Sequence, residues 1–270
     1  MIIINEIQIK DWQNMLEIFD VLCIHQDRNL WNLRGQADAS WHLTPSLVRY
    51  FEREEVPSPK AHGIEISTFR EFQTQAHLYV PHTVLEQISA DVSWMMLMQH
   101  YSCPTRLLDW TQSPFIATYF AVEQCVDADG AIWLFNSSRL DTLMLQKYGH
   151  LKDQIDRIFD HEYAIPAIYP ILGAIHTERS AAQQGSYTFC CSLVGSHEKI
   201  IDECFAEKFP NANGAVDKRL NKIIIPARLK NEFLARLGTM NINARTLFPG
   251  ADGLGRSAAE LVKQRVWTGN

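Results

Sequence analysis

The sequence predicts a single α+β domain with a mixed or antiparallel central sheet surrounded by helices. Segments rich in β-branched and aromatic residues are interspersed with segments of helical periodicity, without the regular spacing of a parallel strand–helix–strand fold. The 270 residues are 46% hydrophobic, which is enough apolar material for one large core. No internal repeat or low-complexity tract divides the chain, so we expect one domain over residues 1–270.

The first half of the chain begins with an expected strand, helix and second strand. Residues 2–9 are β-rich, and Asp11 then caps a helix in which Trp12, Met15 and Phe19 follow at helical spacing. A second strand is expected over residues 30–35. Residues 37–50 are expected to form a loop broken at a proline, and the polar residues 52–63 an exposed excursion.

Helices dominate the remaining predictions, with strands between them. Three helices are expected around residues 69–79, 83–99 and 114–124, the second of them interrupted near residues 91–93. Proline at position 114 suits a first helical turn. Residues 130–136 form a strand, the chain is then mostly helical to about residue 170, and two more strands follow within residues 186–193 and 222–226. The tail from residue 252 is expected to be helical.

Composition excludes several classes of protein. The formal net charge is −6, so the overall charge does not indicate a nucleic-acid partner. The N-terminus lacks the charged and apolar regions of a secretory signal, and no apolar run is long enough to span a membrane. The six cysteines form no C-x-x-C pair and are expected to be reduced and unpaired, so we expect a cytoplasmic location.

The first candidate for chemistry is the dipeptide Arg34-Gly35 at the end of an expected strand. An arginine there can present its planar fork to an anion, and glycine leaves the backbone uncrowded. The alternative is an arginine that pairs with a carboxylate in the core. The dipeptide by itself favours the structural alternative.

The second candidate is the segment of residues 99–114, which places polar groups between apolar residues. These groups are His100, Tyr101, Thr105, Arg106, Asp109 and Thr111. Buried polar groups must find partners, so the segment could be a structural network with an Arg106–Asp109 pair. It could equally face a ligand. We expect Arg34, His100, Arg106 and Asp109 to converge in one concave site.

A third candidate is the polar stretch before the strand at residues 186–193. Glu178, Arg179, Gln183 and Gln184 could form a solvated turn, or they could place an amide or carboxylate at the rim of a site. Motifs for a dinucleotide turn, a phosphate loop and a zinc protease are absent from the sequence. The ten histidines show no metal-ligand spacing, so no metal is expected.

These segments together resemble the FRG domain family. Its opening Phe/Tyr-Arg-Gly motif corresponds here to Leu33-Arg34-Gly35, and its central Q-H-Y-G-x-P-T-R-L-L-D-W-T motif to residues 99–111, with Ser102 in place of glycine. Other positions that fit the family pattern are Gln36, Trp41, Leu43, Pro45, Ser46, Arg49, Arg179, Gln183, Gly185, Tyr187, Ile225, Pro226, Lys230, Leu247, Phe248, Pro249, Asp252 and Gly253. The resemblance therefore spans a core of about residues 28–260.

A weaker resemblance, at the level of fold, is to ADP-ribosyltransferases. Their NAD site uses a strand ending in aromatic-Arg-Gly, a strand bearing Ser/Thr, a helix with small and aromatic residues, and a further strand. Residues 30–35, 105–111, 113–122 and 130–136 follow that order. The glutamate that transferases carry late in the chain has no counterpart here. Its location offers Gln183 and Gln184, with Glu178 some way off. A missing glutamate would argue for a binding module, an altered target chemistry, or a different carboxylate such as Asp109.

The resemblance implies an NAD-binding ADP-ribosyltransferase or NAD glycohydrolase, acting as a toxin or antiphage effector on an unidentified macromolecular acceptor. Arg34 would bind the pyrophosphate, and Tyr101 or Trp110 would stack on nicotinamide. The implied catalytic residues are Arg34, His100, Asp109 and Gln183. The implied NAD-binding residues are Arg34, Gly35, Gln99, Tyr101, Thr105, Arg106, Trp110 and Thr111. The alternatives are a non-catalytic nucleotide- or protein-binding module and, third, a nuclease.

Overall fold

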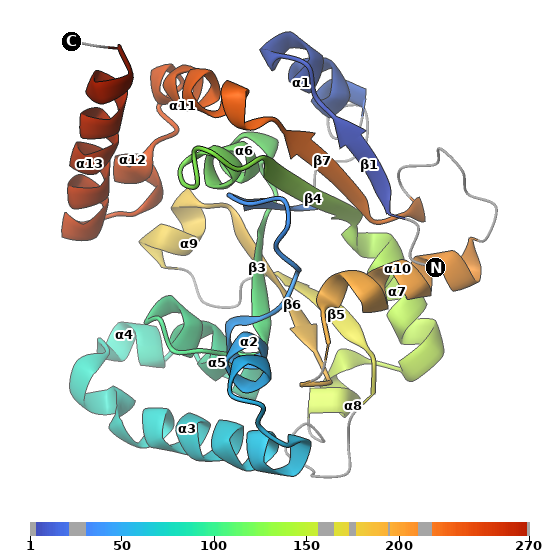
Figure 1. The fold of residues 1–270 in the computed structure, drawn as a ribbon. Coiled ribbons are helices and arrows are strands. Elements are labelled where there is room, and N and C mark those ends of the chain that lie inside the picture. The colour runs from blue at the N-terminus through green and yellow to red at the C-terminus, as the bar shows by residue number, and fades with distance from the viewer. Residues whose placement is uncertain are drawn as a thin grey trace.

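A seven-stranded sheet lies at the centre of the computed structural model, which describes residues 4–21, 31–155, 165–172, 177–193, 195–209 and 218–268 (Figure 1). The strand order is β1-β7-β4-β2-β3-β6-β5. The pair β1–β7 is parallel and the other neighbouring pairs are antiparallel, so the predicted mixed sheet is confirmed. The strands are β1 (Asn5–Gln8), β2 (Trp31–Gln36), β3 (Leu107–Thr111), β4 (Gly130–Asn136), β5 (Ile168–Leu172), β6 (Gly185–Cys190) and β7 (Asn221–Ile225).

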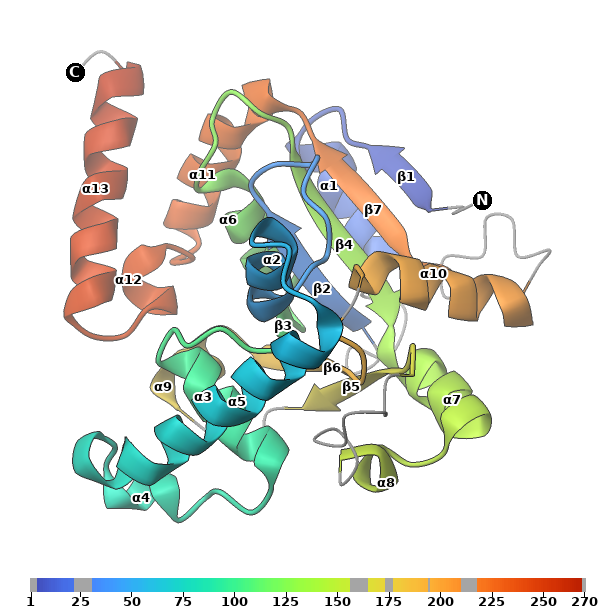
Figure 2. The ribbon, with the colours of Figure 1, turned by 60° about the horizontal axis from the view of Figure 1, so that its bottom comes forward.

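The sheet divides between β2 and β3. β2 pairs with β4 at six positions and β3 pairs with β6 at five, but β2 and β3 share only the pair Leu33 and Thr111. Past this pair, the Arg34 side chain bridges the two strands by donating from Nη1 to the Asp109 carbonyl, 2.7 Å away. In Figure 2 the strands β4, β7 and β1 continue on one side of this division, and β6 and β5 on the other.

Helices cover both faces of the sheet, and each face has its own apolar core. On β4, Ile132 and Leu134 belong to one core while Trp133 and Phe135 belong to the other, as strand alternation requires. The first core is closed by α1 (Trp12–Phe19), α6 (Pro114–Val122), α11 (Lys230–Thr239) and α12 (Ala244–Leu247). The second is closed by α3 (Ser58–Tyr79), α5 (Asp91–His100), α7 (Ser137–Tyr148) and α10 (His197–Lys208).

The described ranges contain five further helices and a short 3₁₀ turn. They are α2 (Ser46–Arg53), α4 (His82–Leu85), α8 (Leu151–Ile155), α9 (Glu178–Ala182), α13 (Ala251–Thr268) and the short 3₁₀ turn Ala227–Leu229. In Figure 1, α11, α12 and α13 gather at the upper left and α3, α4 and α5 at the lower left, with α9 between the two groups. None of the helices in the described ranges combines the length and the apolar character needed to cross a bilayer.

Helix α6 packs directly on the backbone of two neighbouring strands. A Cβ atom at Gly35 would lie 1.9 Å from the carbonyl oxygen of Ala117, and one at Gly130 would lie 2.3 Å from that of Ala121. Neither strand could carry a side chain on this face at those positions. Glycine at position 35 is therefore explained by close packing of α6, which corrects the expectation that the backbone there is uncrowded.

Most predicted elements are confirmed, but four expectations were wrong. Residues 52–63 are not an exposed excursion, because α3 begins at Ser58 and buries Ala61 and His62. Residues 37–50 are not all loop, because Pro45 directly precedes α2 and its fixed φ suits the start of a helix rather than a break. The gap between α4 and α5 covers residues 86–90, before the predicted break at 91–93. The expected helical stretch to residue 170 contains strand β5, where Pro170 is tolerated because β5 is an edge strand.

Five of the six cysteines lie in the described ranges, and all five are free thiols: Cys103, Cys125, Cys190, Cys191 and Cys204. The expectation for Cys23 lies outside the described residues. Burial raises the pKa of Cys190 to about 11 and that of Cys191 to about 12, so both thiols stay protonated at neutral pH.

Candidate functional site

A cleft opens where the sheet divides. It has a volume of about 240 Å³ and is bordered by β2, β3, β6, the end of α5, and α6 and α9. Its lining residues are Leu33, Arg34, Gly35, Gln99, His100, Asp109, Trp110, Thr111, Phe120, Arg179, Ser180, Gln183 and Tyr187. Two segments more than sixty residues apart in the sequence, around Arg34 and around His100 and Asp109, therefore meet in one site.

Arg34 has unused hydrogen-bonding capacity. Its side chain is 21% exposed, and Nη1 lies 4.0 Å from Oδ2 of Asp109 in addition to its bond to the Asp109 carbonyl. The buried Nε atom has no hydrogen-bond partner. Burial lowers the pKa of Arg34 and the Asp109 carboxylate partly offsets this, so the guanidinium remains charged with an unsatisfied donor.

Asp109 supplies a carboxylate at the mouth of the cleft. Its side chain is 59% exposed, and it lies directly opposite Tyr187 on the neighbouring strand β6. Burial raises the pKa of Tyr187, and the negative charge of Asp109 raises it further. The phenol therefore remains protonated at neutral pH and can act as a hydrogen-bond donor.

Helix α5 places its last two residues at the cleft. Burial lowers the pKa of His100, and the positive charge of Arg179 lowers it further, so the imidazole is neutral at pH 7. Gln99 accepts a short hydrogen bond through Oε1 from the hydroxyl of Thr105. Thr105 is 3% exposed and does not line the cleft, so it acts on the site only by fixing this glutamine.

Gln183 and Thr111 connect α9 to the division of the sheet. The hydroxyl of Thr111 donates to the carbonyl of Gln183 over 2.7 Å, and Nε2 of Gln183 donates to the carbonyl of Leu247 over 3.0 Å. The amide of Gln183 is thus partly used in holding the C-terminal segment. Five lining residues were absent from the expected catalytic and NAD-binding sets: Leu33, Phe120, Arg179, Ser180 and Tyr187. Leu33 precedes Arg34 on β2, and the other four come from α6, α9 and β6.

The expectation that Arg106 faces this cleft was wrong. Its side chain is 1% exposed and forms a buried ion pair with Glu65, through Nε at 2.7 Å and a second, shorter bond from Nη2. Nη1 donates to the carbonyls of Cys190 and Cys191 at 3.1 and 3.2 Å. The structural Arg106–Asp109 pair was also wrong, because the buried partner is a carboxylate from α3.

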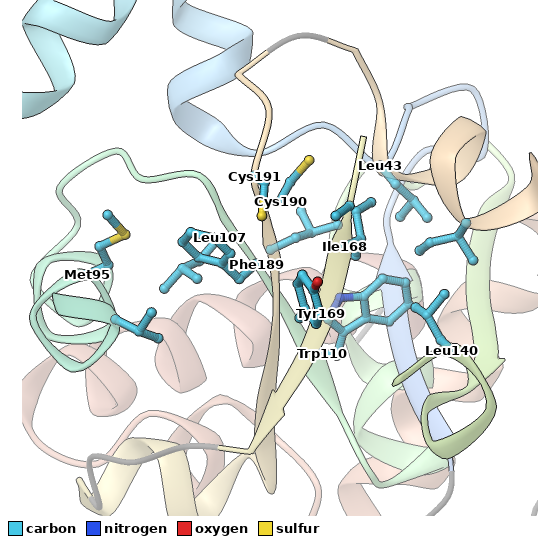
Figure 3. Close-up of a cluster of buried hydrophobic side chains, with 14 of the residues drawn as sticks. Leu43, Met95, Leu107, Trp110, Leu140, Ile168, Tyr169, Phe189, Cys190 and Cys191 are labelled. Atoms are coloured by element: carbon cyan, nitrogen blue, oxygen red, sulfur yellow. The ribbon is translucent and has the colours of Figure 1, made fainter. Parts of the chain in front are cut away.

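The two aromatic residues expected to stack on nicotinamide do not present their rings to the cleft. Trp110 is 3% exposed, and the centroid of its ring lies 4.8 Å from that of Phe135. Figure 3 shows Trp110 within the buried hydrophobic cluster. Tyr101 is 47% exposed and borders a separate apolar groove with Phe72 and Tyr79. Strand alternation turns Trp110 to the face opposite Asp109, which explains the first error.

A buried chain of hydrogen bonds lies behind Arg34. Nε1 of Trp110 donates to the hydroxyl of Thr188 over 2.8 Å, and that hydroxyl lies 3.0 Å from Nδ1 of His197. The Thr188 hydroxyl can donate its proton to Nδ1 or accept one from it, because its oxygen has two lone pairs, and the direction follows the tautomer of His197. Burial lowers the pKa of His197 to about 3, and the charge of Arg34 contributes, so this imidazole is neutral.

A metal site would need several ligating side chains close together, and the described residues do not provide them. Across those ranges, no group of three or more His, Cys, Asp or Glu side chains could hold a metal ion.

Residues 29–130 match the model of the FRG domain family. The chain therefore contains an FRG domain over this range, which includes Arg34 and the segment of residues 99–111. The later positions that fit the family pattern lie beyond the match, so a domain reaching residue 260 and covering the whole chain stays a prediction. Neither the curated proteins nor the solved structures contain a match to the chain. The resemblance to ADP-ribosyltransferases likewise stays a prediction.

Proposed function

From an FRG domain whose motif residues meet in one cleft, we propose an NAD-binding enzyme of the ADP-ribosyltransferase type. It would transfer ADP-ribose to a macromolecular acceptor, or to water as an NAD glycohydrolase. The observation that carries the proposal is Arg34, held 4.0 Å from the Asp109 carboxylate with an unpartnered Nε, where the sheet divides. A planar guanidinium suits a pyrophosphate, and a carboxylate suits a ribose that becomes cationic.

The proposed reaction breaks the bond between the nicotinamide nitrogen and the ribose carbon. The electron pair of that bond goes to the nitrogen and neutralises the pyridinium, leaving an oxocarbenium-like ribose that Asp109 would stabilise. The acceptor oxygen or nitrogen then bonds to the same carbon and loses a proton. His100 is neutral at pH 7 because burial lowers its pKa, so it would be able to take that proton.

The size of the cleft limits how much of NAD it would enclose. At about 240 Å³ the cleft is smaller than the roughly 300–1,000 Å³ of typical ligand pockets. In this proposal the cleft encloses the nicotinamide riboside end and the phosphates, and the adenosine end lies outside. An NAD-consuming enzyme of this kind would serve as a toxin or antiphage effector, as the family resemblance implies.

A non-catalytic nucleotide- or protein-binding module is the second candidate, and Gln183 favours it. Transferases carry a glutamate at this location, whereas here an amide donates to the carbonyl of Leu247. An amide brings no negative charge to a cationic ribose. This alternative keeps the phosphate contacts of Arg34 but predicts no breakage of NAD.

Calorimetric titration with NAD and an assay of nicotinamide release test the proposal on the same preparations. Arg34→Lys should weaken NAD binding about ten- to a hundredfold, since lysine cannot satisfy two phosphate oxygens at once. Asp109→Asn should retain binding and lower nicotinamide release about a hundredfold or more. Arg53→Lys is the matched control, because Arg53 is 64% exposed on α2 and pairs with Glu54 away from the cleft.

Three results would decide between the candidates. A wild-type protein that does not bind NAD removes both the enzyme and the NAD-binding module. Binding without nicotinamide release supports the module. An Arg34→Lys variant that binds NAD as tightly as wild type removes the role given to Arg34.

A further inference from the structure

Arg179 is a second cation on the cleft, and it lies outside the range that matches the FRG family. We propose that Arg179 is a phosphate-binding residue held at the cleft by Phe248, and that the cleft therefore takes a diphosphate rather than a monophosphate. This inference rests on the proposed function and specifies the ligand chemistry of the same site. It also gives a role to the segment around Phe248, which the proposed reaction does not use.

The ring of Phe248 is fixed and holds two guanidinium groups. It is 5% exposed and meets the ring of Phe120 edge to face, with centroids 6.1 Å apart. The guanidinium carbon of Arg179 lies 5.0 Å from the centroid of the Phe248 ring, and that of Arg256 lies 4.2 Å from it. Phe120 also lines the cleft, so this aromatic pair fixes the position of Arg179 at the wall of the site.

Within the described ranges, Arg179 is not paired with a carboxylate. In the described part of the chain, neither Arg179 nor Arg256 forms an ion pair within 4.0 Å, although both lie against one ring. Two neighbouring like charges destabilise each other, so an anion beside Arg179 would be favoured. The charge of Arg179 acts on two groups that line the cleft, because it lowers the pKa of His100 and also that of Tyr187, whose pKa burial raises.

The backbone around Phe248 is also tied to the wall of the cleft. The Leu247 carbonyl accepts from Nε2 of Gln183 at 3.0 Å, next to α9, which carries Arg179. A Cβ atom at Gly253 would lie 1.8 Å from the carbonyl oxygen of Phe248, so only glycine allows α13 to begin this close. The contacts that hold Arg179 are therefore present before any ligand binds.

Two arginines on different elements of one cleft favour a ligand with two phosphates. Arg34 comes from β2 and Arg179 from α9, and each guanidinium can satisfy oxygens of one phosphate. A monophosphate would satisfy one of them and leave the other without an anion. A ligand with two linked phosphates would satisfy both.

Calorimetric titration with ADP-ribose and with AMP separates the two ligand classes. Wild type should bind ADP-ribose at least about tenfold more tightly than AMP, the effect of one more charge-assisted contact. Arg179→Lys and Phe248→Leu should each lower the affinity for ADP-ribose about tenfold and leave that for AMP nearly unchanged. Arg236→Lys is the control, because Arg236 lies 5.7 Å from the Trp12 ring centroid on α11 and pairs with Glu232.

The outcomes keep this inference separate from the proposed reaction. Equal affinity of wild type for ADP-ribose and AMP, or an Arg179→Lys variant with unchanged affinity for ADP-ribose, would overturn it even if NAD is cleaved. ADP-ribose binding that depends on Arg179, without nicotinamide release, supports it and removes only the enzymatic proposal. Because Arg179 lies at the surface of the cleft, Arg179→Lys decides the question even if Phe248→Leu does not fold.

Discussion

Replacing Arg106 by methionine should lower the free energy of unfolding, although Arg106 does not line the cleft. Arg106 uses all three guanidinium nitrogens in bonds to Glu65 and to the carbonyls of Cys190 and Cys191. Methionine would leave the Glu65 carboxylate, on a residue 5% exposed, without its partner. Breaking a buried pair in this way costs about 3–5 kcal/mol. At about 2–4 °C per kcal/mol for a chain of this size, the melting temperature should fall by about 10 °C.

Thermal denaturation of matched variants measures this effect. Arg53→Met is the control, because Arg53 forms a 2.8 Å pair with Glu54 at the surface, where both side chains are more than half exposed. That pair should contribute less than about 1 kcal/mol. The double variant Arg106→Met with Glu65→Met should recover part of the loss, because it removes the stranded charge. A single Arg106→Met variant that melts within about 2 °C of wild type would refute the buried-pair argument.

Three further outcomes are expected. Gly35→Ala should cost about 1–3 kcal/mol in urea denaturation, because its Cβ would lie 1.9 Å from the Ala117 carbonyl oxygen, and an unchanged midpoint would contradict this. Burial lowers the pKa of His197 from 6.5 in the unfolded chain to about 3 in the folded protein. Between these two pH values the histidine is protonated in the unfolded chain but not in the folded protein, so stability falls as the pH drops below 6.5. The expected slope from this group is about 1.4 kcal/mol per pH unit, and His197→Asn should flatten it in urea midpoints measured at several pH values. Thiol titration of the unfolded protein should find all six cysteines free, and a smaller number would disprove the reduced state.

Elements with a strong local pattern were predictable from the sequence. Strand β4 has the predicted bounds, because its apolar run begins at Gly130 and every residue in it is buried. Helix α6 begins at Pro114 as expected, with Ser113 accepting a hydrogen bond at its N-terminus. The helices α10 and α11 were not predicted, because charged residues lie between their few buried apolar residues and weaken the helical pattern of hydrophobicity. Their position depends on the sheet that they cover, which local periodicity does not describe.

The candidate site was predictable in part, since the family motifs contain several of the residues that line it. Arg34, His100, Asp109 and Gln183 all reach one cleft. The contact between Phe248 and Arg179 at the wall of the cleft could not be inferred from spacing, because it joins segments that are distant in the sequence. The division of the sheet could not be predicted either, since it depends on the pairing of β2 with β3, which stops after one position.

The two motif arginines show what distinguishes a ligand-binding residue from a structural one in this fold. Arg34 lies in β2 and Arg106 directly precedes β3, and both carry a charge that the protein must satisfy. Arg106 has its hydrogen bonds completed by Glu65 and two backbone carbonyls, so a ligand would have to displace protein groups. Arg34 donates to one carbonyl and leaves a buried Nε without an acceptor. Because the Arg34 side chain is also 21% exposed, its remaining hydrogen-bonding capacity favours an anion at Arg34 and none at Arg106.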